Sequence, residues 1–128
     1  ALKEWGITAE SVPYIETRQT SEEQGYLAAK ELLSGQDRPS ALLCMSDVFA
    51  LGVIRAAKEM QLKVPEDLSV IGFDGITSGQ KLPNQLTTIR QDGQAKGALA
   101  AKMILGHQPL GDFILPLELM PGGTCWPR

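Results

Sequence analysis

The sequence has little of several features that mark specialised classes of protein. Its 128 residues include 2 cysteines and 1 histidine, and only 5% are aromatic. Positive charge is not in excess, because 12 Lys+Arg stand against 15 Asp+Glu and give a net charge of −3. The longest uncharged apolar runs are too short to cross a bilayer. These shortages argue against a disulfide-stapled miniprotein, a membrane-spanning chain and a nucleic-acid-binding surface on this segment alone.

Signatures of catalysis and of metal binding are also missing. Cys44 and Cys125 lie far apart with no CxxC spacing, and His107 lies in a Gly-His-Gln-Pro turn. There is no G-x-S-x-G elbow and no phosphate-binding glycine loop. We therefore predict that the protein is not an enzyme and that it needs neither a cofactor nor a metal.

What remains is the composition of an ordinary globular domain with a sizeable core, since 43% of the residues are apolar and 21% are charged. The first six residues resemble the last turn of a helix closed by Gly6. We therefore expect that the chain was cut from a longer one.

Helical periodicity is found in three segments. Ser21 and Gln24 form a capping box before a helix at 22–33, Ser46 and Asp47 precede a helix at 48–60, and Asp92 opens a helix at 92–105. The segments between them have the apolar or alternating patterns of strands, at 12–17, 41–45, 68–73, 86–90 and 113–120. The pattern at 41–45 is that of a strand buried on both faces, and Pro116 makes 113–120 an edge strand. Strands separated by helices predict an α/β fold with a parallel sheet.

Ligands of open parallel sheets bind at the carboxyl ends of the strands. Those ends carry Ser46, Asp47, Asp74 and Gln91, with Thr20 and the aromatic Phe73 beside them. Carboxylates, hydroxyls and an amide suit a ligand with several hydroxyl groups.

Most of these residues also have a structural alternative. Asp47 fits an N-cap better than a ligand contact, and for Ser46 the two roles are equal. Thr20 precedes the Ser21 cap, and Gln91 is ambiguous. Asp74 precedes no clear helix, so for this residue the binding role is favoured.

Three strings in this order resemble the effector-binding core of the LacI/GalR transcriptional regulators: SDVFALG at 46–52, VPEDLSVIGFD at 64–74 and LTTIRQ at 86–91. The similarity covers essentially the whole chain. It implies a three-layer parallel-sheet subdomain of the type I periplasmic-binding-protein fold, here truncated, with 1–91 as the C-terminal subdomain. Residues 92–120 would be a crossover helix and strand that normally pack in a missing N-terminal subdomain, and 121–128 a tail.

The resemblance also implies ligand contacts by position. Asp74 corresponds to an effector-contacting aspartate, Ser46 to a frequent ligand-contacting Asn, and Asp47 to the Asp beside it. Thr20 stands where an aromatic often stacks on a sugar, and Gly75 replaces a frequent second acid. The first departure argues against a sugar held by ring stacking. The second means that the carboxylate cluster is thinner than in many relatives.

The function implied is that of an effector-sensing domain in a cytoplasmic, DNA-binding regulator. Such regulators are homodimers or tetramers that bind a sugar or related metabolite, and operator DNA through an N-terminal helix-turn-helix absent from this chain. The alternative is the exported sugar-binding protein of an ABC transporter. The second helix has more apolar surface than one sheet face covers, so its apolar residues are either additional core or an interface. The resemblance implies a dimer interface at Val48, Phe49, Leu51, Lys81, Leu82 and Pro83.

Overall fold

The computed structural model describes residues 2–8, 11–76, 79, 82 and 84–126. A short 3-10 helix, η1 (Leu2–Trp5), comes first. The helices are α1 (Glu22–Leu33), α2 (Asp47–Glu59) and α4 (Gly93–Ile104). The strands are β1 (Ala41–Leu43), β2 (Ser69–Asp74), β3 (Thr87–Gln91) and β4 (Leu117–Met120).

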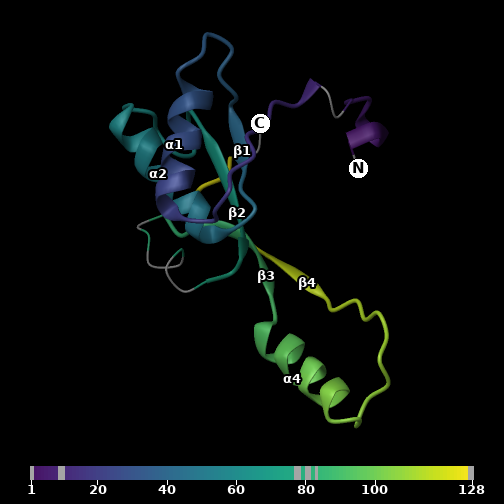
Figure 1. The fold of residues 1–128 in the computed structure, drawn as a ribbon. Coiled ribbons are helices and arrows are strands. Elements are labelled where there is room, and N and C mark those ends of the chain that lie inside the picture. The colour runs from purple at the N-terminus through teal and green to yellow at the C-terminus, as the bar shows by residue number, and fades with distance from the viewer. Residues whose placement is uncertain (1, 9–10, 77–78, 80–81, 83, 127–128) are drawn as a thin grey trace.

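The four strands form one sheet in the order β1-β2-β3-β4. β1, β2 and β3 are parallel, and β4 runs antiparallel to β3 (Figure 1). The predicted α/β class with a mostly parallel sheet is therefore confirmed. The last strand begins directly after Pro116, which agrees with the edge position expected for it.

Helices α1 and α2 lie side by side next to the sheet (Figure 1), and their facing sides form the core with β2. They approach so closely that a Cβ on Gly52 would lie 1.9 Å from the carbonyl oxygen of Glu22. Only glycine fits such a contact. The apolar side chains that are almost fully buried are small or branched, among them Ala50, Val53, Ala56, Leu68, Val70 and Leu86.

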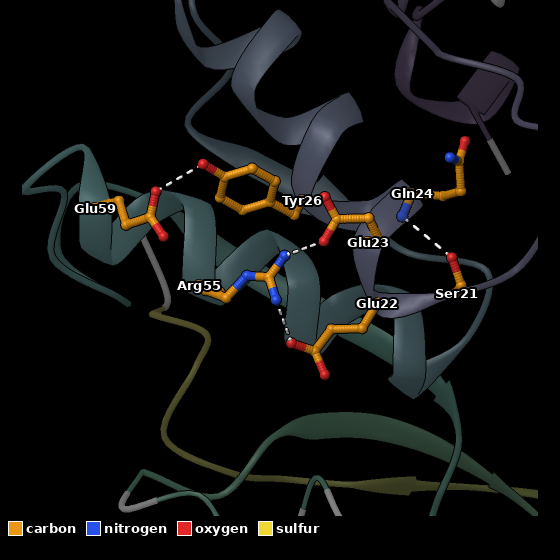
Figure 2. A network of polar contacts seen from close by, with 7 residues as sticks. All are labelled: Ser21, Glu22, Glu23, Gln24, Tyr26, Arg55 and Glu59. Carbon is orange, nitrogen blue, oxygen red and sulfur yellow. Dashed lines mark hydrogen bonds and ion pairs between the residues drawn. The ribbon is translucent and has the colours of Figure 1, made fainter.

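A network of polar side chains links α1 and α2 on their exposed surface (Figure 2). Arg55 donates to Glu22 Oε1 at 3.0 Å and to Glu23 Oε2 at 2.6 Å, and its guanidinium lies 4.4 Å from the ring centre of Tyr26. The Tyr26 hydroxyl donates to Glu59 at 2.7 Å, a hydrogen bond that raises the pKa of Tyr26. These exposed contacts add modestly to the packing beneath them.

One predicted strand is not formed, and the predicted burial of another is wrong. Residues 12–17 run beside β1 without joining the sheet, and Pro13 has no amide hydrogen to offer such a strand. The segment 41–45 is not buried on both faces, since Leu43 is 69% and Met45 79% exposed. Because the helices cover one face, only alternate side chains such as Leu42 and Cys44 face the core.

Beyond β3 the chain extends away from the helix pair as an arm made of α4 and β4 (Figure 1). α4 has no buried residue, although most of its side chains are apolar. The following segment also exposes large apolar side chains, among them Leu110, Ile114 and Leu119. None of the helices within the described residues has the length and apolarity needed to span a bilayer.

Candidate functional site

Two of the predicted ligand residues meet at the carboxyl ends of neighbouring strands. β2 ends at Asp74 and β3 ends at Gln91, and the strands pair in parallel with Asp74 opposite Arg90. The Gln91 side-chain amide donates to Asp74 Oδ1 at 2.8 Å. Parallel pairing therefore turns two residues 17 positions apart into a hydrogen-bonded carboxylate–amide pair.

A lysine that the sequence analysis did not single out extends this pair. Lys96 Nζ donates to Gln91 Oε1, so the amide lies between an ammonium group and a carboxylate. Asp92 positions the lysine, because its side chain accepts from the amide of Ala95 at 2.9 Å and so starts α4 directly after β3. The signal for Lys96 was its place near the start of a helix that follows a strand end.

A small cavity of about 230 Å³ adjoins this group. Four of its lining residues come from the ends of β2 and β3 and from the start of α4, and the others come from the segment leading into β4. They are Phe73, Gln91, Asp92, Lys96, Phe113, Leu115, Pro116 and Leu117. Aromatic and aliphatic walls with a few polar groups are typical of small-molecule sites.

The backbone at Asp74 has an uncommon conformation. Its φ of 109° is positive, a region that non-glycine residues seldom occupy and that costs about 1–3 kcal/mol. The turn is held on one side by the bond from Gln91 and on the other by the amide of Ile76, which donates to Asp47 Oδ2 at 2.7 Å. Such retained strain is common at binding sites.

Asp47 lies beneath this turn and is fully buried. Besides Ile76, it accepts from Thr88 Oγ1 at 2.5 Å, so each carboxylate oxygen has a donor from the protein. A Cβ on Gly72 would lie 2.2 Å from Asp47 Oδ1, so β2 needs glycine there for the carboxylate to fit. Asp47 is the first residue of α2 and not its N-cap, a role that Ser46 fills by accepting from the amide of Phe49 at 3.1 Å.

Within the part of the chain that the structure describes, the other predicted ligand residues, Ser46 and Thr20, make no hydrogen bond to the Asp74–Gln91 pair. Ser46 is buried at its cap position, with 5% of its surface exposed. Thr20 is exposed and lines a different, larger cavity of about 1050 Å³ beside β1. The structure thus places Phe73 and Gln91 on the wall of one cavity, joins Gln91 to Asp74, and holds the turn after Asp74 through Asp47.

Cys44 and Cys125 also line the larger cavity, and both are free thiols. Burial, with a smaller contribution from the charge of Asp47, raises the pKa of Cys44 to about 12. Burial also raises the pKa of Cys125. Protonated thiols are poor nucleophiles, so this cavity has no activated cysteine.

The residues predicted for a dimer interface are only partly available on the surface. Val48 is 37% exposed, whereas Phe49 and Leu82 are half-buried and pack against the core. Lys81 and Pro83 lie outside the described residues. The α1–α2 contact covers part of the apolar surface of α2 that the sequence analysis left without a partner.

Comparison with known proteins gives a consistent result. Residues 1–125 match the periplasmic binding protein-like domain family. The transcriptional repressor PurR of Klebsiella pneumoniae is 43% identical over 83 residues, which are 65% of this chain and 24% of that protein. The PurR repressor of Photorhabdus laumondii is 39% identical over 103 residues, which are 80% of this chain and 28% of that protein. The chain thus spans about a quarter of the length of these relatives.

Comparison with solved structures gives the same result as comparison with sequences. A LacI family regulator from Enterococcus faecium with bound ribose has a TM-score of 0.83 at 26% identity, over 99% of this chain and 48% of that one. The lac repressor dimer bound to operator and an anti-inducer has a TM-score of 0.79 at 29% identity, over 97% of this chain and 44% of that one.

Proposed function

Since the chain belongs to the periplasmic binding protein-like domain family, in its LacI/GalR group, we propose that it is the effector-binding part of a DNA-binding transcriptional regulator. Its ligand is a small sugar or related metabolite. The observation that carries this proposal is the hydrogen-bonded Asp74–Gln91 pair at the carboxyl ends of β2 and β3.

The chemistry of the pair supports a hydroxyl-rich ligand. Among the described residues only Gln91 donates to the Asp74 carboxylate, and it does so at Oδ1. A carboxylate can accept from two neighbouring hydroxyl groups. Phe73 adds an apolar surface next to the pair. In this scheme Asp74, Gln91 and Phe73 contact the ligand, whereas Asp47 holds the turn through Ile76 and Ser46 caps α2. Thr20 contributes only if a larger ligand extends toward β1.

The remaining parts of the proposal concern partners. The regulator acts as a homodimer or tetramer in the cytoplasm and binds operator DNA through a helix-turn-helix outside this segment. Its dimer contact uses the side of α2 that carries the exposed Val48 and the half-buried Leu51. Support comes from the relatives, which are repressors, and from the lac repressor structure, which is a dimer on its operator. The same relatives argue against the transport alternative.

Binding of sugars to the natural full-length protein tests the proposal. A panel of D-ribose, D-glucose, sucrose and lactose is screened by the rise in melting temperature that a native-state ligand produces. For the sugar that binds, Asp74→Ala weakens affinity by about tenfold or more, because a hydrogen bond to a charged group is lost. Operator binding in a gel-shift assay is retained.

The matched control is Asp37→Ala, which removes an exposed carboxylate far from the site in sequence. It leaves sugar affinity unchanged. Equal affinity of Asp74→Ala and the unmodified protein would show that the ligand binds elsewhere.

A further inference from the structure

We propose that Lys96 is a specificity-determining, positioning residue: it fixes the orientation of the Gln91 amide and so adapts the site to an uncharged vicinal diol. This inference rests on the proposed function. It starts from the relay in which Lys96 Nζ donates to Gln91 Oε1 and Gln91 Nε2 donates to Asp74 Oδ1.

Only one orientation of the amide satisfies both neighbours. A glutamine side chain ends in an acceptor oxygen and a donor NH₂ group of nearly the same size. With the ammonium of Lys96 on one side and the carboxylate of Asp74 on the other, the oxygen must face the lysine. The flipped amide would set oxygen against carboxylate and NH₂ against ammonium, and both contacts would be repulsive.

The fixed amide determines what the site offers to a ligand. Gln91 Nε2 has two N–H groups, and one of them is directed at Asp74 Oδ1. The other is held as a donor next to a carboxylate that still accepts through its second oxygen. A donor and an acceptor side by side match two adjacent hydroxyl groups, since each hydroxyl both donates and accepts.

Charge favours an uncharged ligand over an anion. The lysine offsets Asp74, but Asp92 adds a further carboxylate to the wall of the same cavity. Asp74, which is hydrogen-bonded to the lining residue Gln91, together with Asp92 and Lys96 of the cavity wall, carries a formal charge of −2 + 1 = −1. A phosphorylated or acidic sugar would meet this excess of negative charge.

The stability of the fold does not explain the lysine. Lys96 is exposed on a helix that has no buried residue. It also lies near the positive N-terminal end of α4, where the helix dipole does not favour a cation. Its removal should therefore change the site without unfolding the protein.

The first test observes the amide directly. In ¹⁵N spectra the Gln91 NH₂ signals are assigned by their loss in Gln91→Met, and they are then compared in Lys96→Met, Lys96→Arg and Lys102→Met. We expect Lys96→Met to move both proton shifts toward those of free glutamine. Lys96→Arg keeps a cation and Lys102→Met changes another exposed lysine of α4, so both keep the original shifts. Unchanged Gln91 signals in Lys96→Met would overturn the proposal.

The second test measures affinity for D-ribose and D-ribose 5-phosphate by titration calorimetry on the natural full-length protein. Lys96→Met weakens binding of D-ribose about tenfold, the effect of one charge-assisted hydrogen bond, and Lys96→Arg restores it to within about twofold. Melting temperatures without ligand stay equal in all variants.

Two outcomes of this titration contradict the positioning role. Loss of affinity for the phosphate sugar alone would mean that Lys96 binds an anion directly, and unchanged affinity for both probes would mean that it does not act on the site. If the unmodified protein binds neither probe and no sugar of the larger panel, the proposed function fails. The amide signals still decide the orientation of Gln91 in that case.

Discussion

Thr88 on β3 donates a hydrogen bond to Asp47 at the start of α2, and the carboxylate that accepts it is fully buried. The second oxygen of that carboxylate accepts from the amide of Ile76, two residues beyond Asp74. One buried side chain thus joins a helix, a strand and the turn that presents the candidate ligand-binding carboxylate.

Removal of this carboxylate should cost more stability than removal of any exposed one. Asp47→Ala leaves the Thr88 hydroxyl and the Ile76 amide without their acceptor, and we expect a loss of about 2–4 kcal/mol in the free energy of unfolding. Urea denaturation measures it. Asp37→Ala, in an exposed loop, should change the free energy by less than about 0.5 kcal/mol. Similar losses in the two variants would mean that the buried contacts contribute little.

The close crossing of α1 and α2 gives a second prediction. In Gly52→Ala the new methyl group meets the Glu22 carbonyl oxygen, so the helices must separate, and we expect a loss of about 1–3 kcal/mol. Gly97→Ala is the matched control, because Gly97 lies in the middle of α4 with no atom near its missing Cβ. That change should be neutral or stabilise the arm by about 0.5–1 kcal/mol. Circular dichroism during thermal unfolding distinguishes the two, and a neutral Gly52→Ala would contradict the tight contact.

The buried thiol of Cys44 gives a prediction about pH. Its pKa rises from 9.0 to about 12, so the native state holds the proton more tightly than the unfolded chain does. The resulting stabilisation is complete below pH 9 and is lost as the pH rises toward 12. In urea unfolding between pH 8 and pH 11, the fall in stability should therefore be shallower for Cys44→Ala than for the unmodified protein. Equal slopes would argue against a tightly held proton.

The sequence by itself determined the fold class and most of the elements. The helix at α1 was predicted from Ser21, which does accept from the amide of Gln24, and the helix at α4 from Asp92, which caps it as expected. Caps and helical periodicity are local, so neighbouring residues specify them whatever surrounds the helix.

Burial was less predictable, because it depends on what covers each face of the sheet. The apolar run 41–45 has the composition of a central strand, yet β1 pairs only with β2 among the described residues and leaves Leu43 exposed. Composition reports how apolar a segment is and not which neighbours it has.

The candidate site also has a part that could be predicted from the sequence and a part that could not. The sequence placed Asp74 and Gln91 at strand ends, where a parallel sheet brings polar side chains to one edge. Only the tertiary structure decided that these two are hydrogen-bonded to each other, that the buried Asp47 holds the turn after Asp74, and that Lys96 donates to the amide oxygen. These contacts depend on the direction of side chains from separate elements, and that direction is set by packing and register after the chain has folded.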